Sequence, residues 1–211
     1  MIIYPKSFKH LKRMVKKSKK DLQRTVFKHL VIEPKVIFDI GANIGAYSYL
    51  FSKQYPNSNI YSFEPVVDNF NNLVKNMEHS NIKNVTPYNY GFYKECAELE
   101  LGVPILDEKD SRGGTYRFVD TQEELTNKVL SKFMVLDEYV SENNITEIDI
   151  LKLDVEGAEK DVFKGGKNAL KITKMLHIEL WHDHLDMIDY LESSNFKLVG
   201  RYRQNRLFER K

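Results

Sequence analysis

The chain has 211 residues, of which 42% are hydrophobic, and this length and composition suit a globular fold that buries its own core without disulfides or metal ions. A single cysteine excludes an internal disulfide. The sequence has neither a secretory signal nor an apolar run of about eighteen residues, so we expect a cytoplasmic protein without a transmembrane segment.

The first 35 residues are strongly basic. They hold eleven Lys or Arg residues against Asp21 and Glu33, a balance of +9, which leaves −7 for the rest of a chain whose net charge is +2. Apolar residues recur in this segment at the spacing of a helix, namely Phe8, Leu11, Val15, Leu22, Val26 and Leu30. We therefore predict two regions, a basic N-terminal helical segment at residues 1–35 and a second region at residues 36–211.

Three roles remain open for the basic helix. It can be a solvated helix that packs on the fold, a contact with an anionic membrane or nucleic acid, or a contact with a preceding domain or a larger assembly. The acidic balance of the remaining chain disfavours a broad nucleic-acid-binding surface.

Residues 36–45 predict a strand that runs into a tight turn and then into a helix. Asp39 lies near the end of an apolar, β-prone run, and Gly41 and Gly45 follow. Such a junction places backbone N–H groups and the positive end of a helix dipole at the carboxyl end of a strand, where nucleotide-like ligands bind in open α/β sheets. A dinucleotide motif needs a glycine beside the pyrophosphate, and this chain has Asn43 there, which disfavours a dinucleotide.

A second β-prone run, residues 59–63, is followed by Glu64 and Pro65. In doubly wound folds an acid at the end of the second strand accepts hydrogen bonds from ribose hydroxyls. The alternative is that Glu64 interacts with the dipole of the helix that Pro65 opens. The sequence spacing between the first motif and Glu64 favours the interpretation that Glu64 binds ribose hydroxyls.

The rest of the chain alternates between helical and strand patterns with short connections. Strands are predicted at residues 84–89, 97–101, 116–119, 133–136, 148–154 and 175–180, and a terminal hairpin pairs residues 196–200 with 206–209. This alternation predicts an α/β fold with a mostly parallel sheet, helices on both faces and an antiparallel last strand.

Acidic residues follow two of the later strands. Asp154 and Glu156 come at the end of one, and Glu179 and His182 come at the end of the next. Because parallel strands place their carboxyl ends at one edge of the sheet, we expect these side chains to surround one crevice with Asp39 and Glu64. Carboxylates and an imidazole suit either proton abstraction from an alcohol or the binding of a divalent cation.

Four ordered motifs resemble the FkbM family of S-adenosylmethionine (SAM)-dependent methyltransferases. They are D-I-G-A-N-I-G-A-Y-S from residue 39, S-F-E-P from residue 62, I-L-K-L-D-V-E-G-A-E from residue 150 and H-I-E-L from residue 177. The similarity covers about residues 36–200. It implies a Rossmann-like class I methyltransferase fold with a seven-stranded sheet.

The resemblance also implies a role for each matching residue. Asp39, Gly41, Asn43 and Gly45 hold the amino-acid end of SAM, Glu64 with Pro65 beside it binds the ribose, and Gly91 and Phe92 lie near the adenine. The family often has an acid near Gly91, and this chain has aromatic residues instead.

We expect transfer of the methyl group to a hydroxyl of a sugar, such as a 6-deoxyhexose, by in-line displacement. The predicted catalytic residues are His182, whose ordinary pKa suits a base near neutrality, and Asp154 or Glu179. A divalent cation held by Asp154, Glu156, Glu179 and His182 is the rival prediction. Two other functions stay open: methylation of nucleic acid or protein through the basic helix, and a non-catalytic module that binds SAM.

Overall fold

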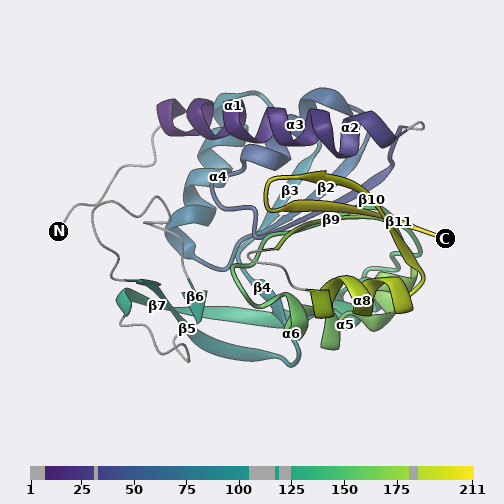
Figure 1. Cartoon of the computed structure of the whole chain (residues 1–211). Helices are drawn as coiled ribbons and strands as arrows, with labels where there is room; N and C mark the ends of the chain where they lie inside the picture. The colour runs from purple at the N-terminus through teal and green to yellow at the C-terminus, as the bar shows by residue number, and fades with distance from the viewer. Residues whose placement is uncertain (1–7, 31–32, 105–116, 119–124, 181–184) are drawn as a thin grey trace.

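The computed structural model describes residues 8–30, 33–104, 117–118, 125–180 and 185–211. A central sheet separates two layers of helices (Figure 1). Its seven strands have the order β10-β11-β9-β8-β1-β2-β3. They are β1 (Val36–Ile40), β2 (Asn59–Phe63), β3 (Val85–Tyr88), β8 (Ile148–Leu153), β9 (Thr173–Glu179), β10 (Phe196–Tyr202) and β11 (Asn205–Arg210).

Five neighbouring strands, from β9 to β3, pair in parallel, and β11 pairs antiparallel with both β9 and β10. This arrangement confirms the predicted mostly parallel, seven-stranded sheet with an antiparallel last strand. The central strand β8 is buried along its whole length, as expected for a parallel strand covered on both faces. Pro87 lies in β3 at the edge of the sheet, where the missing N–H leaves no ladder bond unmade.

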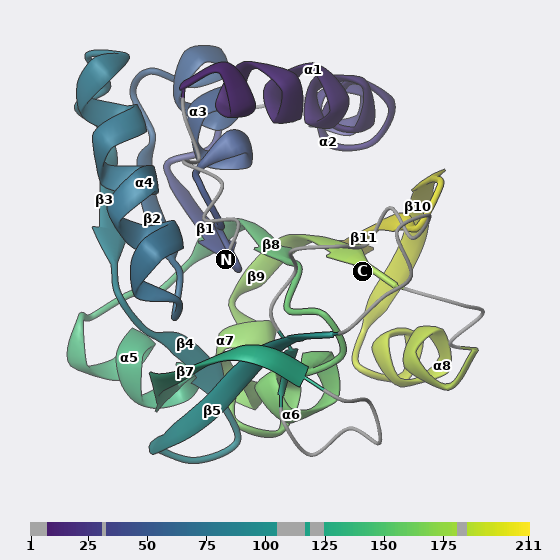
Figure 2. The same ribbon diagram turned by 90° about the vertical axis from the view of Figure 1, so that its left-hand side faces the viewer.

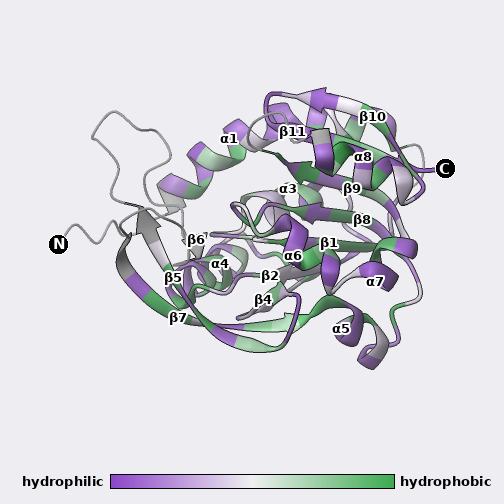
Figure 3. Ribbon diagram, turned by 60° about the horizontal axis from the view of Figure 1, so that its bottom comes forward, coloured by the Kyte–Doolittle hydropathy of each residue, from purple (hydrophilic) through white to green (hydrophobic). Residues whose placement is uncertain are grey.

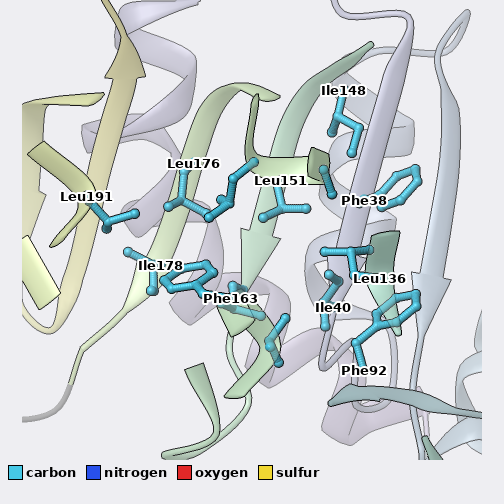
Figure 4. Packing of buried hydrophobic residues seen from close by; sticks show 14 of the residues in the cluster. Phe38, Ile40, Phe92, Leu136, Ile148, Leu151, Phe163, Leu176, Ile178 and Leu191 are labelled. Carbon is cyan, nitrogen blue, oxygen red and sulfur yellow. The ribbon is translucent and has the colours of Figure 1, made fainter. Parts of the chain in front are cut away.

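Alternate residues of each strand face opposite layers. Ile37 and Ile150 pack in one cluster with residues of α1 (Phe8–Arg24), α2 (Val26–His29) and α3 (Ala46–Gln54). On the other face Phe38 and Leu151 pack in a larger cluster (Figure 4) with α5 (Leu136–Glu142), α6 (Glu159–Lys164), α7 (Lys167–Lys171) and α8 (Leu185–Ser193). Burying each such side chain contributes about 1.5–3 kcal/mol, so these two clusters fix the sheet between its helices.

A second sheet has the strand order β4-β7-β5-β6. Its strands are β4 (Gly91–Tyr93), β5 (Ala97–Pro104), β6 (Arg117–Phe118) and β7 (Leu125–Val135). The sequence predicts short strands in this part of the chain, but it does not show that β4 pairs with β7 across more than forty residues. Figure 2 shows this sheet on one side of the strand ends of the central sheet and α1 on the other.

The basic N-terminal helix packs on the fold. α1 alternates between hydrophobic and hydrophilic residues along its length (Figure 3), and Leu11 and Leu22 are at most 1% exposed. α1 ends before Thr25, whose hydroxyl donates to the carbonyl of Asp21, and α2 follows. The structure therefore shows a packing helix with a charged outer face, and its contact with a further domain or assembly stays a prediction. Among the described helices none has the length and apolar character needed to cross a membrane.

Candidate active site

One cavity of about 820 Å³ lies at the carboxyl ends of the central strands. Its lining includes most of the residues predicted from the sequence, namely Gly41, Asn43, Glu64, Pro65, Gly91, Phe92, Asp154, Glu156 and Glu179. The volume lies near the upper end of the range for small-molecule sites, about 300–1,000 Å³. Two of the predicted cofactor residues, Asp39 and Gly45, lie outside this lining, and His182 lies outside the described residues.

Different contacts exclude a side chain at the two glycines of the first motif. Gly41 has φ +75°, and a Cβ there would lie 1.8 Å from the backbone oxygen of Asp154. Any side chain would therefore separate β1 from β8 at the floor of the cavity. Gly45 has φ +87° and precedes α3, where a Cβ would lie 2.8 Å from Met77 of α4 (Val67–His79). The structure thus assigns Gly45 to helix packing and gives it no place on the cavity wall.

Glu64 is buried but lines the cavity, and backbone groups fix the orientation of its carboxylate. One carboxylate oxygen accepts a hydrogen bond from the N–H of Asn43 at 2.8 Å. The other accepts from the N–H of Val66 at 3.0 Å and from the side-chain amide of Asn69 at 3.1 Å. These three donors hold the carboxylate in one orientation at the cavity wall. This geometry suits an acceptor for a diol.

Gly91 and Phe92 place β4 beside Glu64. A Cβ at Gly91 would lie 2.7 Å from the ring of Phe133 and 3.3 Å from Pro65, so the backbone approaches both closely. Phe92 is only 1% exposed, and its ring lies 4.7 Å from that of Phe63, centroid to centroid. Phe92 is therefore mainly a core residue, while Gly91 lets β4 pack closely against Phe133 and Pro65 at the cavity wall.

Asp39 lies beneath the cavity floor, where it is completely buried. It accepts a hydrogen bond from the hydroxyl of Ser48 at 2.6 Å, and its other oxygen lies 3.1 Å from Nζ of Lys152. Lys152 is 2% exposed and donates to the carbonyl of Gly41 at 2.9 Å. Asp39 therefore acts on the glycine turn through Lys152.

Lys152 is a site residue that the sequence reasoning missed. Burial alone disfavours its charged form, but the carboxylates of Asp39 and Asp154 outweigh burial and raise its pKa above the ordinary value. A lysine between Leu151 and Leu153 in a strand pattern was the available signal, because such a charge is rarely buried without a partner. Its partner is the residue opposite in the β1–β8 register, Asp39.

Asp154, Glu156 and Glu179 form an acidic cluster, and one carboxylate oxygen of each lies within 4.8 Å of the other two. Leu153 is in register with Ile178, so the next residues, Asp154 and Glu179, leave their strands side by side. The pKa of Glu179 is raised to about 9. The largest cause is burial, followed by the charge of Asp154, a side-chain hydrogen bond with Asp154 and the charge of Glu156. The cluster confirms that these three acids converge.

The acidic cluster offers two kinds of chemistry. Three carboxylate oxygens at this spacing form the donor set that Mg²⁺ or Ca²⁺ prefers. Without a cation the raised pKa keeps Glu179 protonated at neutral pH, and its deprotonated form is a stronger base than an ordinary carboxylate. Both alternatives predicted from the sequence remain compatible with the geometry.

The raised pKa of Glu179 predicts how stability depends on pH. Glu179 loses its proton near pH 4 to 5 in the unfolded chain but near pH 9 in the folded protein, so the folded state binds more protons between these values. Stability that is present at low pH is therefore lost as the pH rises toward 9. Glu179→Gln removes this loss, and its Tm relative to the wild type should rise between pH 5 and pH 9 by at least about 2–4 °C, the shift for 1 kcal/mol in a chain of this size.

Thermal unfolding at several pH values in the presence of a chelator measures this difference. The exposed Glu192 on α8 supplies a matched control, Glu192→Gln, whose Tm difference should stay constant. A constant difference for Glu179→Gln as well would contradict the raised pKa.

The remaining wall of the cavity comes from α1 and from the turn between β10 and β11. One face of α1 contributes His10, Arg13, Met14, Lys17, Ser18 and Asp21, and the turn contributes Tyr202, Arg203, Gln204 and Asn205. Asp21 is buried, accepts a hydrogen bond from the hydroxyl of Tyr47 at 2.7 Å and lies 3.0 Å from Nε2 of His177. This acid therefore anchors α1 to α3 and β9.

Together the parallel sheet order, the antiparallel β11 and a cavity at the carboxyl edge define the Rossmann-like fold of class I methyltransferases. The chain belongs to the FkbM methyltransferase family, because the model of the methyltransferase FkbM domain matches residues 39–198. Methyltransferase FkbM from Methylobacillus flagellatus KT has a similar structure, with a TM-score of 0.61 and 17% identity over 86% of this chain and 45% of that one. At that identity the likeness shows the fold alone.

Two curated relatives are more similar in sequence to this chain than the Methylobacillus protein is. Hexuronic acid methyltransferase AglP of Haloferax volcanii is 29% identical over 148 residues, which cover 70% of this chain and 56% of that protein. Methyltransferase 1 of Beauveria bassiana is 32% identical over 143 residues, which cover 61% of this chain and 57% of that protein. The chain thus matches little more than half the length of these relatives.

Proposed function

We propose that the protein transfers a methyl group from SAM to a hydroxyl of a sugar, in a glycan or a glycosylated metabolite such as one containing a 6-deoxyhexose. The observation that carries this proposal is one cavity in which the glycine turn and Glu64 lie beside the acidic cluster. Membership of the FkbM family supports the donor. The similarity to a hexuronic acid methyltransferase supports a sugar as the acceptor.

The donor fits the part of the cavity between the first two strands and β4. Glu64 would accept hydrogen bonds from the two ribose hydroxyls, and the backbone near Asn43 would face the amino-acid end. The adenine ring would lie along the cavity wall that Gly91 lines. When bound, SAM supplies a methyl group that its sulfonium has already activated. Catalysis by this chain then consists mainly of holding the acceptor hydroxyl in line and taking its proton.

The pair Asp154–Glu179 is the base that the described residues supply. Transfer would join the acceptor oxygen to the methyl carbon as the carbon–sulfur bond breaks to leave neutral S-adenosylhomocysteine, and Glu179 would take the hydroxyl proton. A divalent cation held by Asp154, Glu156 and Glu179 would instead position the hydroxyl and lower its pKa. His182 remains a predicted base that stands outside the described residues.

Glu64→Gln tests the assignment of the donor site. Loss of a hydrogen bond to a charged group costs about 1.5–3 kcal/mol, so the Kd for S-adenosylhomocysteine should rise about 10- to 150-fold. Isothermal titration calorimetry with S-adenosylhomocysteine measures this change. NAD, which carries the same adenosine unit with a pyrophosphate, should bind neither protein.

The matched control is Glu78→Gln at the end of α4, where the side chain is exposed and lies outside the cavity. Its Kd should equal that of the wild type. Glu64 also anchors the N–H groups of Asn43 and Val66, so the Tm of each ligand-free variant must be compared. Unchanged binding by Glu64→Gln, in a variant that is folded, would remove Glu64 from the donor site.

The acceptor class is tested with labelled SAM and a panel of neutral and anionic glycosides, each with and without EDTA. Incorporation of label into a glycoside supports the proposal, and loss of activity in EDTA that Mg²⁺ restores assigns the acidic cluster to a cation. Binding of S-adenosylhomocysteine without transfer to any glycoside would point to a non-catalytic module. Transfer to RNA or protein alone would replace the proposed acceptor.

A further inference from the structure

We propose that the acceptor sugar carries a phosphate or diphosphate group, which Arg13 and Lys17 on α1 and Arg203 in the β10–β11 turn bind. This inference rests on the proposed function and adds the chemical class of the acceptor. It starts from the wall of the cavity that the donor and the acidic cluster do not use.

Two of the cations lie on the face of α1 that lines the cavity. His10, Arg13 and Lys17 are spaced three and four residues apart, so they occupy one face of the helix. Met14, Ser18 and Asp21 continue the same face along the cavity. Arg13, Lys16, Lys17 and Lys20 are all exposed, but only Arg13 and Lys17 line the cavity.

The charge of this wall is not neutralised within the described ranges. No ion pair there joins Arg13, Lys17 or Arg203 to a carboxylate. Asp21, the acid on the same face of α1, is buried against Tyr47 and His177 instead. The turn residue Tyr202 lies beneath two guanidinium groups, 5.1 Å from that of Arg24 and 5.6 Å from that of Arg203, which ties the turn to α1.

Binding of SAM does not require the positive charges of Arg13, Lys17 and Arg203. The amino-acid end of SAM is a zwitterion, so its carboxylate is already accompanied by an ammonium group. The acidic cluster at the ends of β8 and β9 would repel an anion, so an anionic acceptor must direct its charge toward α1. A phosphate fits this wall better than a carboxylate, because it carries more charge and more acceptor oxygens for the arginine fork and the lysine ammonium.

The geometry also favours a small phosphorylated acceptor over RNA. The three cations face a cavity, whereas a nucleic-acid surface is a broad basic patch. The chain beyond residue 35 carries a net charge of −7, since residues 1–35 carry +9 of a total of +2. The phosphate can belong to a nucleotide-linked sugar in solution or to a sugar linked to a lipid diphosphate.

The test compares two double variants that remove the same charge from the same helix. Arg13→Gln/Lys17→Gln changes the cavity face, and Lys16→Gln/Lys20→Gln changes the outer face at the same spacing. The full chain is saturated with S-adenosylhomocysteine, and binding of inorganic pyrophosphate is measured by calorimetry in about 0.15 M salt, where long-range attraction is screened. The cavity pair should weaken binding about tenfold or more, and the control pair less than about twofold.

Transfer assays then identify the source of the phosphate. Labelled SAM is offered with a hexose 1-phosphate, the UDP-linked hexose, vesicles that contain a polyprenyl diphosphate hexose, and the neutral methyl hexoside. A preference of about tenfold or more for any phosphorylated form over the neutral one, lost in Arg13→Gln/Lys17→Gln, supports the proposal. The form with the highest kcat/KM distinguishes a soluble from a lipid-linked acceptor.

Four results would overturn the proposal. The first is an equal loss of pyrophosphate affinity in the two double variants, and the second is a methyl glucuronoside that outcompetes the hexose phosphate. The third is RNA that binds more tightly than pyrophosphate and loses affinity equally in both variants. The fourth is a large loss of S-adenosylhomocysteine affinity in Arg13→Gln/Lys17→Gln. The last result would assign the cations to the donor. Failure of the wild type to bind S-adenosylhomocysteine is a separate outcome, which would overturn the proposed function itself.

Discussion

Lys152→Met is expected to lower the free energy of unfolding by about 3–5 kcal/mol, the cost of removing one partner from a buried ion pair. Methionine matches the length of the lysine stem and keeps the packing, but it leaves the Asp39 carboxylate completely buried without its cation. It also removes the hydrogen bond to the carbonyl of Gly41. Urea unfolding followed by circular dichroism measures the change.

A second substitution tests whether the unpaired charge causes this loss. Adding Asp39→Asn to Lys152→Met removes the charge and should recover much of the lost free energy, because a neutral amide costs less to bury than a carboxylate. Lys174→Met is the matched control on the neighbouring strand β9. Its side chain is 52% exposed and pairs with Glu147 and Asp149, so the expected loss is about 1 kcal/mol or less. If the two lysine variants lose similar free energies of unfolding, the buried pair stabilises the fold no more than the exposed one does.

The same pair shows what the sequence could predict and where local patterns fail. The runs around β1 and β8 are apolar and end in acids, so strands, sheet class and the gathering of Asp154 with Glu179 follow from the rule that parallel strands share a carboxyl edge. The role of Asp39 does not follow from that rule. It depends on which residue lies opposite in the β1–β8 register, and this register joins segments more than a hundred residues apart.

Long-range pairing also explains the other elements that the sequence left undetermined. The second sheet depends on β4 pairing with β7, and neither strand has a local pattern that names its partner. In α1 the spacing of Leu11 and Leu22 predicts a buried face, but the cavity face is polar and looks solvated in the sequence alone. Asp21 and Lys17 become site residues only because α1 lies beside the carboxyl ends of the central strands (Figure 2).

The dependence of methyl transfer on pH separates the two proposed bases. A base acts when deprotonated, so kcat/KM rises with pH until the pKa of that base is passed. If Glu179 is the base, the rate measured in EDTA should rise about tenfold per pH unit toward pH 9. If His182 is the base, the rate should level off above about pH 6.5 to 7. Initial rates with labelled SAM and the best glycoside from the panel measure this profile.

Glu179→Gln tests directly whether Glu179 takes the proton of the acceptor hydroxyl. Glutamine keeps the size of the side chain but cannot take a proton, so kcat should fall about 10²- to 10⁴-fold and the remaining rate should lose its rise toward pH 9. Affinity for S-adenosylhomocysteine should stay within about twofold, because Glu179 acts on the acceptor hydroxyl. His182→Gln is the matched comparison and should leave the profile in place. A flat profile in the wild type, together with full activity of Glu179→Gln, would assign the proton transfer to another group and leave the acidic cluster to a cation.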